Sequence, residues 1–210
     1  MGIAIVTGAG RGIGLELALQ LGKRGRHVVA VCRNRSPELE TSGMRIESGI
    51  DLTSREAGSQ LAGLFARDDI ELLIHNAGVL RDDQLDHLDP DSVRAQFELN
   101  ALVPISLTAA LAPRLVQGAK LALISSRMGS IGDNTSGGYY GYRMSKAALN
   151  AAGVSLAHDL RPRGVTVVIL HPGAVRTGMT GGRGLLDRID ELSLETTGRF
   201  FHQDGSSLPW

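Results

Sequence analysis

Tyr142 and Lys146 are the two side chains in this sequence that are best suited to proton transfer. They stand four positions apart in a helical stretch, so they share one face of the helix. A free phenol has a pKa of about 10, and a nearby ammonium stabilises the phenolate, so Lys146 can make Tyr142 a usable general acid–base. Taken alone, the pair is better read as an ordinary aromatic residue beside a surface lysine, and the assignment needs further motifs.

All three tyrosines of the chain lie in one short segment, GGYYGYRMSK, at 137–146. Tyr142 is the one with a lysine four residues further on. For Tyr139 and Tyr140 the sequence leaves two interpretations open, a wall of the substrate pocket or ordinary packing.

A glycine-rich turn, TGAGRGIG at 7–14, joins an apolar run to a helical pattern. Gly8 permits a tight turn, Gly12 leaves room for a pyrophosphate beside the backbone, and Gly14 lets the helix pack closely on the sheet. The free N–H groups at the helix start attract phosphate. The strand before and the helix after the turn support a dinucleotide site, although the Gly-x-x-x-Gly-x-Gly spacing departs from the commoner fingerprint.

The residues after the second expected strand favour NADP(H) over NAD(H). A dinucleotide fold places there either an acid for the ribose 2′-OH or an arginine for a 2′-phosphate. Here the strand ends in VCRNR, with Arg33, Arg35 and no acid, and Arg11 lies in the glycine turn. Solvated surface arginines are the alternative. Asp51, after the third strand, can accept a hydrogen bond from the adenine amino group, cap the next helix, or do both.

These motifs need elements to position them, and the sequence alternates strands with helices. Apolar runs predict strands at 2–8, 27–33, 44–48, 70–78, 120–126 and 165–173. Helical periodicity falls at 13–25, 55–66, 90–115, with Pro104 and Pro113 as interruptions, and 142–160. A last helix and an edge strand are expected before the end of the chain. We therefore expect an α/β fold, a single Rossmann-type doubly wound parallel sheet of about seven strands with helices on both faces. Such a sheet binds ligands at the carboxyl ends of its strands, where the motifs fall.

The composition fits one enzyme-sized domain over residues 1–210. Lys+Arg and Asp+Glu both number 22, and this balance argues against a nucleic-acid or anionic-membrane surface. The single cysteine, Cys32, excludes an internal disulfide and offers no metal cluster. No apolar run reaches the roughly 20 residues that span a bilayer, and no signal peptide is apparent before the first strand. We expect a cytoplasmic protein without a metal.

Six motifs occur in the order of one known superfamily: TGAGRGIG (7–14), HNAG (75–78), ELNAL (98–102), ISS (124–126), Tyr142-x-x-x-Lys146 and HPGAVRT (171–177). Over residues 2–177 the chain resembles the short-chain dehydrogenases/reductases. The wording from ISSRMGS to SKAALN and the ending DGSSLPW are most similar to the C-factor-like and sniffer-like carbonyl reductase branch. The resemblance implies an NADP(H)-dependent oxidoreductase that transfers a hydride between nicotinamide and a carbonyl or alcohol substrate.

The resemblance also implies roles for individual residues. Tyr142 is the general acid–base, Lys146 lowers its pKa and holds the nicotinamide ribose, Ser126 rather than Ser125 binds the substrate oxygen, and Asn100 supports a proton relay through Lys146. The implied cofactor-binding residues are Gly8, Arg11, Gly12, Ile13, Gly14, Arg33, Asp51, Leu52, Asn76, Ala77, Gly78, Tyr142, Lys146, Pro172, Gly173, Val175 and Thr177.

Three further expectations complete the sequence analysis. The segment 178–184 is shorter than the substrate lid that is usual in the family. Either the pocket is open and has no lid, or residues are missing from the numbered chain. We expect the segment to be mobile without ligand, with a fixed short turn between the sixth strand and the last helix as the alternative. The helices at 90–115 and 142–160 are apolar on more than one face, which with the resemblance predicts a homodimer or homotetramer. A cofactor-binding signalling or regulatory protein of the same fold, with little turnover, is the alternative function.

Overall fold

The computed structural model describes residues 2–173 and 183–210, and its centre is a seven-stranded sheet in the order β3-β2-β1-β4-β5-β6-β7. Every neighbouring pair of these strands is parallel. The strands are β1 (Ile3–Thr7), β2 (His27–Val31), β3 (Arg45–Glu47), β4 (Ile70–His75), β5 (Leu115–Ile124), β6 (Thr166–His171) and β7 (Arg199–His202). The order reverses between β1 and β4, so the crevice that binds ligands in such sheets opens at the carboxyl ends of these two strands.

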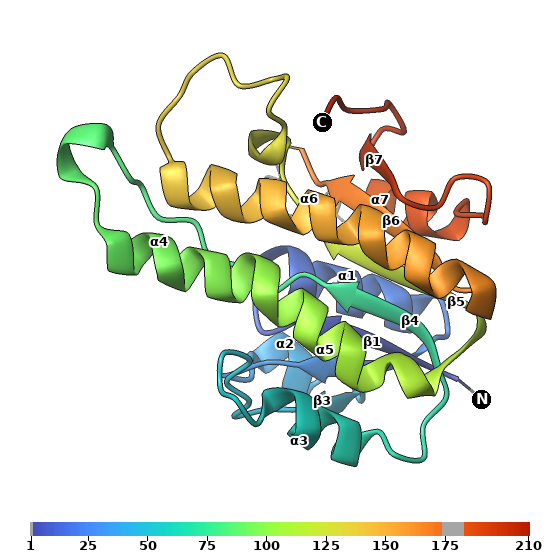
Figure 1. The fold of residues 1–210 in the computed structure, drawn as a ribbon. Coiled ribbons are helices and arrows are strands. Elements are labelled where there is room, and N and C mark those ends of the chain that lie inside the picture. Colours follow the sequence, from blue (N-terminus) through green and yellow to red (C-terminus); the bar gives the residue numbers. More distant parts are fainter. Residues whose placement is uncertain (1, 174–182) are drawn as a thin grey trace.

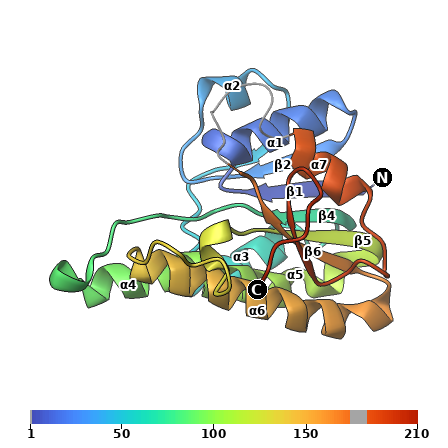
Figure 2. The same cartoon turned by 90° about the horizontal axis from the view of Figure 1, so that it is seen from above.

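Helices cover both faces of the sheet, as Figure 2 shows. One face carries α1 (Gly12–Lys23), α2 (Pro37–Glu40) and α7 (Arg183–Asp190). The other face carries α3 (Ala57–Leu64), α4 (Pro90–Phe97), α5 (Val103–Leu111) and α6 (Tyr140–Leu160). Figure 1 shows α4 and α5 following each other in one continuous helix, with α6 running beside α4 on this second face.

Two hydrophobic layers follow from the alternation of side chains along each strand. Ile3 and Ile5 of β1 face the layer under α3, α5 and α6, whereas Ala4 and Val6 face the layer under α1 and α7. Both faces are buried, which explains why the strands read as continuous apolar runs. The expected fold class is therefore confirmed.

Two differences from the sequence-based expectation change the local structure, while other element ends move by a few residues. β5 begins at Leu115, five residues early, with a register shift against β4 between Ile70 and Leu72. The helical stretch from 90 is not broken at Pro104. A π-helical turn, η2 (Glu98–Leu102), joins α4 to α5, and the Val103 N–H donates to the Glu98 carbonyl oxygen. Pro104 then falls in the first turn of α5, where its missing N–H disturbs the helix least.

The continuous helix from Pro90 to Arg114 is long and apolar enough to cross a membrane by length and composition alone. Charged residues interrupt this stretch in the sequence, so it is not predicted to span a bilayer. In the structure this helix packs between α3 and α6, and its apolar residues Val103, Leu107 and Leu111 belong to the core. Burial inside the fold thus accounts for part of its hydropathy.

Candidate active site

Ser126 and Tyr142 meet at the carboxyl edge of the sheet. Ser126 follows β5, and Tyr142 lies in the first turn of α6. The Ser126 side chain lies near enough to the Tyr142 hydroxyl to lower its pKa. Burial raises the pKa of Tyr142 above its ordinary value of 10, and Ser126 acts in the opposite direction. The tyrosine is therefore a protonated phenol at neutral pH, which is the form that donates a proton.

Lys146 lies one turn further along α6, is 4% exposed, and donates from Nζ to the Ile124 carbonyl oxygen at 2.8 Å. Its Nζ is 5.8 Å from the centre of the Tyr142 ring. Burial lowers the pKa of Lys146 to about 8. The lowering of the Tyr142 pKa by Lys146 that the sequence analysis expected is not found here, because burial dominates and the ammonium points to the end of β5.

The two serines after β5 have different surroundings. Ser125 Oγ donates to Asn150 Oδ1 of α6 at 2.6 Å, and Asn150 Nδ2 donates to the Gly129 carbonyl oxygen. Ser126 Oγ instead accepts the Met128 N–H at 3.2 Å and faces Tyr142. Ser125 is thus occupied by packing contacts, and Ser126 is the serine placed for chemistry.

Asn100 stands in the π-helical turn η2, a feature that often marks functional sites. Its amide group exchanges two hydrogen bonds with the main chain of Val79, both of 2.8 Å, and donates to Ser145 Oγ at 2.9 Å. Asn100 Oδ1 and Lys146 Nζ both lie close to Gly78, where a Cβ would come within 3.0 and 3.6 Å of them. Asn100 therefore holds the segment after β4 against α6, and its role in a proton relay stays a prediction.

The glycine turn is tied to the neighbouring strand by Asn76. Asn76 Nδ2 donates to the main-chain oxygens of Thr7 and Gly8 at 3.1 and 3.3 Å. Gly8 has a φ of 68° and lies against Ala77, and a Cβ at Gly14 would collide with the Gly8 carbonyl oxygen. Both glycines are thus required by the turn.

The start of α1 fits a phosphate group. Gly12 has a φ of 59° with open space where a Cβ would be, Arg11 makes no side-chain cap, and the first turn carries no acid. Ile13 follows, half-buried against the core. These unoccupied N–H groups and the positive end of the helix dipole suit the pyrophosphate of a dinucleotide.

The loop after β2 lies beside this turn, because a Cβ at Gly10 would come within 2.6 Å of the Asn34 carbonyl oxygen. Arg33 and Arg11 are exposed, whereas Arg35 Nε donates to Ser48 Oγ at 2.9 Å. Arg35 is exposed as well but is held by this bond, and the structure therefore brings Arg11 and Arg33 to one side of the candidate cofactor site.

Asp51 does not cap the next helix. Its Oδ1 accepts the N–H and the hydroxyl of Thr53 at 3.0 and 2.7 Å, which lowers the pKa of Asp51. α3 begins only at Ala57, so these bonds close a local turn instead. Asp51 is exposed and Leu52 is buried, so the Asp51 carboxylate is accessible to the adenine ring of a cofactor.

At the end of β6, Pro172 is buried and Gly173 has a φ of 72°. A Cβ at Gly173 would come within 3.0 Å of His202 Nε2 from β7. Val175, Thr177 and the expected lid residues up to 182 lie outside the described residues.

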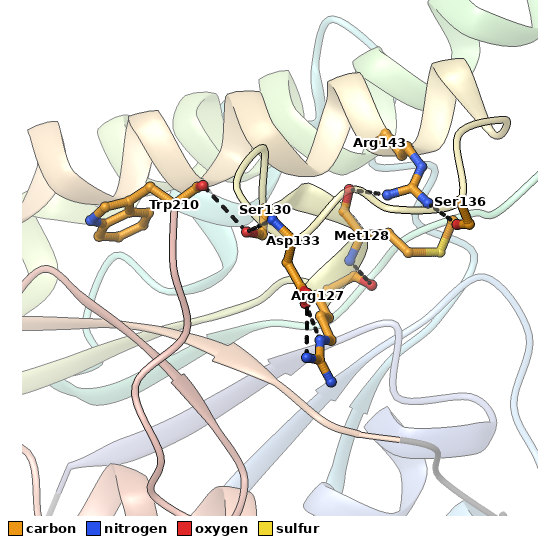
Figure 3. Close-up of polar contacts among 8 residues, drawn as sticks. Arg127, Met128, Ser130, Asp133, Ser136, Arg143 and Trp210 are labelled. Carbon is orange, nitrogen blue, oxygen red and sulfur yellow. Dashed lines mark hydrogen bonds and ion pairs between the residues drawn. The ribbon is translucent and has the colours of Figure 1, made fainter.

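The loop that follows Ser126 is held at several points, as Figure 3 shows. Arg127 forms an ion pair with Asp133, and the Trp210 main-chain oxygen accepts bonds from Ser130 Oγ and from the Gly132 N–H. Arg143, next to Tyr142, donates to Ser136 Oγ at 2.8 Å and to the Met128 carbonyl oxygen. The sequence did not predict these contacts of Arg143, because its partners come close only when the loop folds back on α6.

Tyr139 and Tyr140 flank the same loop. Tyr139 is the one residue other than glycine with a positive φ, 51°, in the described part of the chain. Tyr140 is 37% exposed and opens α6. A role in the wall of the substrate pocket and a role in packing both fit the positions of Tyr139 and Tyr140.

The short chain dehydrogenase family matches residues 2–185 of this sequence. The 1-hydroxy-2-glutathionyl-2-methyl-3-butene dehydrogenase of Rhodococcus sp. (strain AD45) is 41% identical over the full length of both chains. The C-signal protein of Myxococcus xanthus is 46% identical over 154 residues, which are 67% of this chain and 93% of that protein.

Solved structures of similar proteins include carbonyl reductases. Carbonyl reductase Sniffer of D. melanogaster has a TM-score of 0.91 and 31% identity, with both chains fully covered. A carbonyl reductase from Pseudomonas aeruginosa PAO1 in complex with NADP has a TM-score of 0.87 and 30% identity, again with both chains fully covered. The chain therefore belongs to the short-chain dehydrogenase family and is an NAD(P)-dependent oxidoreductase of the carbonyl reductase branch.

Proposed function

We propose that this protein uses NADP(H) to interconvert a carbonyl compound and an alcohol, with Tyr142 as the general acid–base. The observation that carries the proposal is that Ser126, after β5, and Tyr142, in the first turn of α6, meet at the carboxyl edge of the sheet, with Lys146 buried one turn away. Two hydroxyl groups that face each other can both reach one substrate oxygen, which is the geometry that proton transfer to a carbonyl requires.

The residues of the chain then have separate tasks. When bound, NADPH supplies the hydride. Ser126 donates a hydrogen bond to the substrate oxygen and orients it, and Tyr142 gives its proton to that oxygen as the alcohol forms. Tyr142 holds its proton before the reaction begins, because the pKa of its phenol lies above the ordinary value. Lys146 lies next to the tyrosine with a pKa of about 8, so it can take up and release protons near neutral pH.

The glycine turn, the start of α1 and the loop after β2 would hold the cofactor. Preference for NADP(H) rests on exposed Arg11 and Arg33 beside that turn and on the absence of an acid in the VCRNR segment. The similarity to an NADP-bound carbonyl reductase supports it.

Activity measurements on Tyr142→Phe test the proposal. NADPH oxidation is followed against aldehydes, ketones and quinones, and NADP⁺ reduction is followed with a thioether alcohol bearing a glutathionyl group, by analogy with the Rhodococcus relative. We expect turnover to fall by orders of magnitude while NADPH binding, measured by fluorescence, is retained. Tyr140→Phe, two residues away, is the control, and near-normal turnover of Tyr142→Phe would exclude the assignment.

A second candidate function is signalling with little turnover, which the similarity to C-signal favours. The grouping of Ser126, Tyr142 and Lys146 at one edge of the sheet argues for catalysis. A protein that only binds the cofactor has no need of a tyrosine beside Ser126. Absence of turnover with every substrate above, together with tight NADPH binding, would favour signalling.

We also propose that the protein forms a homodimer or a homotetramer through α4, α5 and α6. Val103, Leu107 and Leu149 face the core, but Leu102 and Met144 on the same helices are 44% and 53% exposed. The apolar residues thus divide between the sheet side and an outer face, as the sequence pattern predicted.

A further inference from the structure

Asp83 is a buried carboxylate in the loop between β4 and α4, and it is 2% exposed. Within the described residues it takes part in none of the ion pairs with arginine, lysine or histidine. Burying such a group costs free energy unless hydrogen bonds compensate. What Asp83 bonds to therefore indicates why it is there.

Its partners lie on two different helices. Ser92 Oγ and Gln96 Nε2, one turn apart on α4, donate to Oδ1 and Oδ2 at 3.2 and 2.7 Å. The Gly141 N–H at the start of α6 donates to Oδ2 at 3.1 Å, and the Tyr139 N–H donates to the Asp83 main-chain oxygen at 2.8 Å. The two helices begin at the same end of the molecule, so one side chain can reach both (Figure 1).

The start of α6 lacks a cap of its own. Tyr139 occupies the N-cap position in the left-handed region, with φ 51° and ψ 41°, and its side chain makes no capping bond. The unpaired N–H groups of a first turn need an acceptor, and a carboxylate there is favourable to the helix dipole. Asp83, 58 positions earlier in the chain, supplies that acceptor.

The packing around this cap is tight. A Cβ at Gly141 would come within 2.5 Å of Gln96 Nε2, 2.8 Å of Asp83 Oδ2 and 3.0 Å of Val93 Cα. Gln96 in turn accepts the Arg81 N–H at 2.9 Å, which fixes the loop that carries Asp83. The residue that follows Gly141 is Tyr142, so a shift of this first turn displaces the tyrosine from Ser126.

We propose that Asp83 is a positioning residue: by capping the first turn of α6 from the loop after β4, it holds the Tyr142 hydroxyl in line with Ser126. The inference rests on the proposed role of Tyr142 in proton transfer. A displacement of about 1 Å in a catalytic group can lower the rate of an enzyme about a hundredfold.

The test compares Asp83→Ala, Asp83→Asn and Asp82→Ala. Asp82 is exposed and accepts a bond from Gln84, so its variant controls for loss of charge in the same loop. For Asp83→Ala we expect kcat with a carbonyl probe to fall about tenfold or more, with the KM for NADPH changed by less than about threefold. Asp83→Asn should recover most of the turnover, because its amide oxygen can accept from Gln96 and Gly141 while its NH2 donates to Ser92.

Amide hydrogen exchange provides a second measurement that needs no turnover. In Asp83→Ala, exchange should accelerate at residues 139–146 more than in the strands of the sheet. Equal acceleration everywhere, or kcat and exchange both matching Asp82→Ala, would overturn the proposal. If Asp83→Ala does not fold, Gln96→Met, which removes one donor to the carboxylate, is judged by the same two measurements. Normal turnover of Tyr142→Phe would instead reject the proposed function and leave the exchange result to decide the capping role of Asp83.

Discussion

Ser125 Oγ donates to Asn150 Oδ1 at 2.6 Å, whereas its neighbour Ser126 faces Tyr142. β5 turns consecutive side chains to opposite sides at its carboxyl end, so one serine packs under α6 and the other lines the site. This arrangement separates a structural role from a chemical one within two residues.

The two serines should respond differently to alanine substitution. Ser126→Ala should lower kcat by at least about tenfold with little change in the melting temperature, because it loses a bond to the substrate oxygen. Ser125→Ala should destabilise the fold by about 1–3 kcal/mol, because it leaves the buried Asn150 oxygen unpaired. Steady-state kinetics and thermal unfolding of both variants measure the difference, and the reverse pattern would exchange their roles.

Cofactor preference should depend on Arg33. Dissociation constants measured by fluorescence should be lower for NADPH than for NADH in the unmodified protein. Arg33→Asp should narrow or reverse this difference, because a carboxylate repels the 2′-phosphate and can accept from a ribose 2′-OH. Arg35→Asp is the matched comparison, since Arg35 is already bonded to Ser48. Equal affinities for both cofactors in the unmodified protein would contradict the proposed preference.

The stability of the protein should decrease in acid partly through His75. Thr108 Oγ1 donates to the Pro104 carbonyl oxygen, so His75 Nε2, 2.9 Å from Thr108 Oγ1, must carry the proton of the neutral ring. His75 Nδ1 is buried without a partner among the described residues, and burial lowers the pKa of His75 to about 3. In the unfolded chain the pKa is about 6.5, so the unfolded state binds the extra proton between these values and stability falls as the pH drops.

Chemical denaturation at several pH values tests this expectation. Between about pH 6.5 and pH 3 the histidine should contribute a loss of up to about 1.4 kcal/mol for each pH unit. His75→Phe removes the titrating group and should flatten the dependence in this range, whereas His158→Gln, on the exposed side of α6, should not. An unchanged pH dependence in His75→Phe would show that other groups control acid unfolding.

The fold could be read from the sequence because the inner strands β1, β4 and β6 are buried on both faces and therefore appear as apolar runs. The glycine turn was equally legible, since the positive φ of Gly8 and the contact of Gly14 with the Gly8 carbonyl oxygen both lie within one strand–turn–helix unit. The choice of Ser126 over Ser125 came from the family resemblance, and the structure adds the reason, which is the bond between Ser125 and Asn150.

Other features have no local signature. The π-helical turn at Asn100 lies inside one continuous helix. The spacing of apolar residues along that helix therefore does not reveal it. The contact between Asp83 and Gly141 joins residues 58 positions apart, and a single aspartate in a polar loop gives no hint of burial. The pKa of Tyr142 is raised because the folded chain buries its side chain away from water. The four-residue spacing to Lys146 does not predict this burial.

The assembly prediction rests on the outer face of α5 and α6. Ile105 is 37% exposed on α5, Met144 is 53% exposed on α6, and the two helices lie on the same face of the sheet (Figure 2). Light scattering at micromolar concentration should give at least twice the mass of one 22.3 kDa chain. Ile105→Glu should shift the mass towards a single chain, because an unpaired carboxylate buried in an interface costs several kcal/mol. Leu194→Glu, at a residue 40% exposed and remote from these helices in sequence, should leave the mass unchanged. A single-chain mass for the unmodified protein would contradict the prediction.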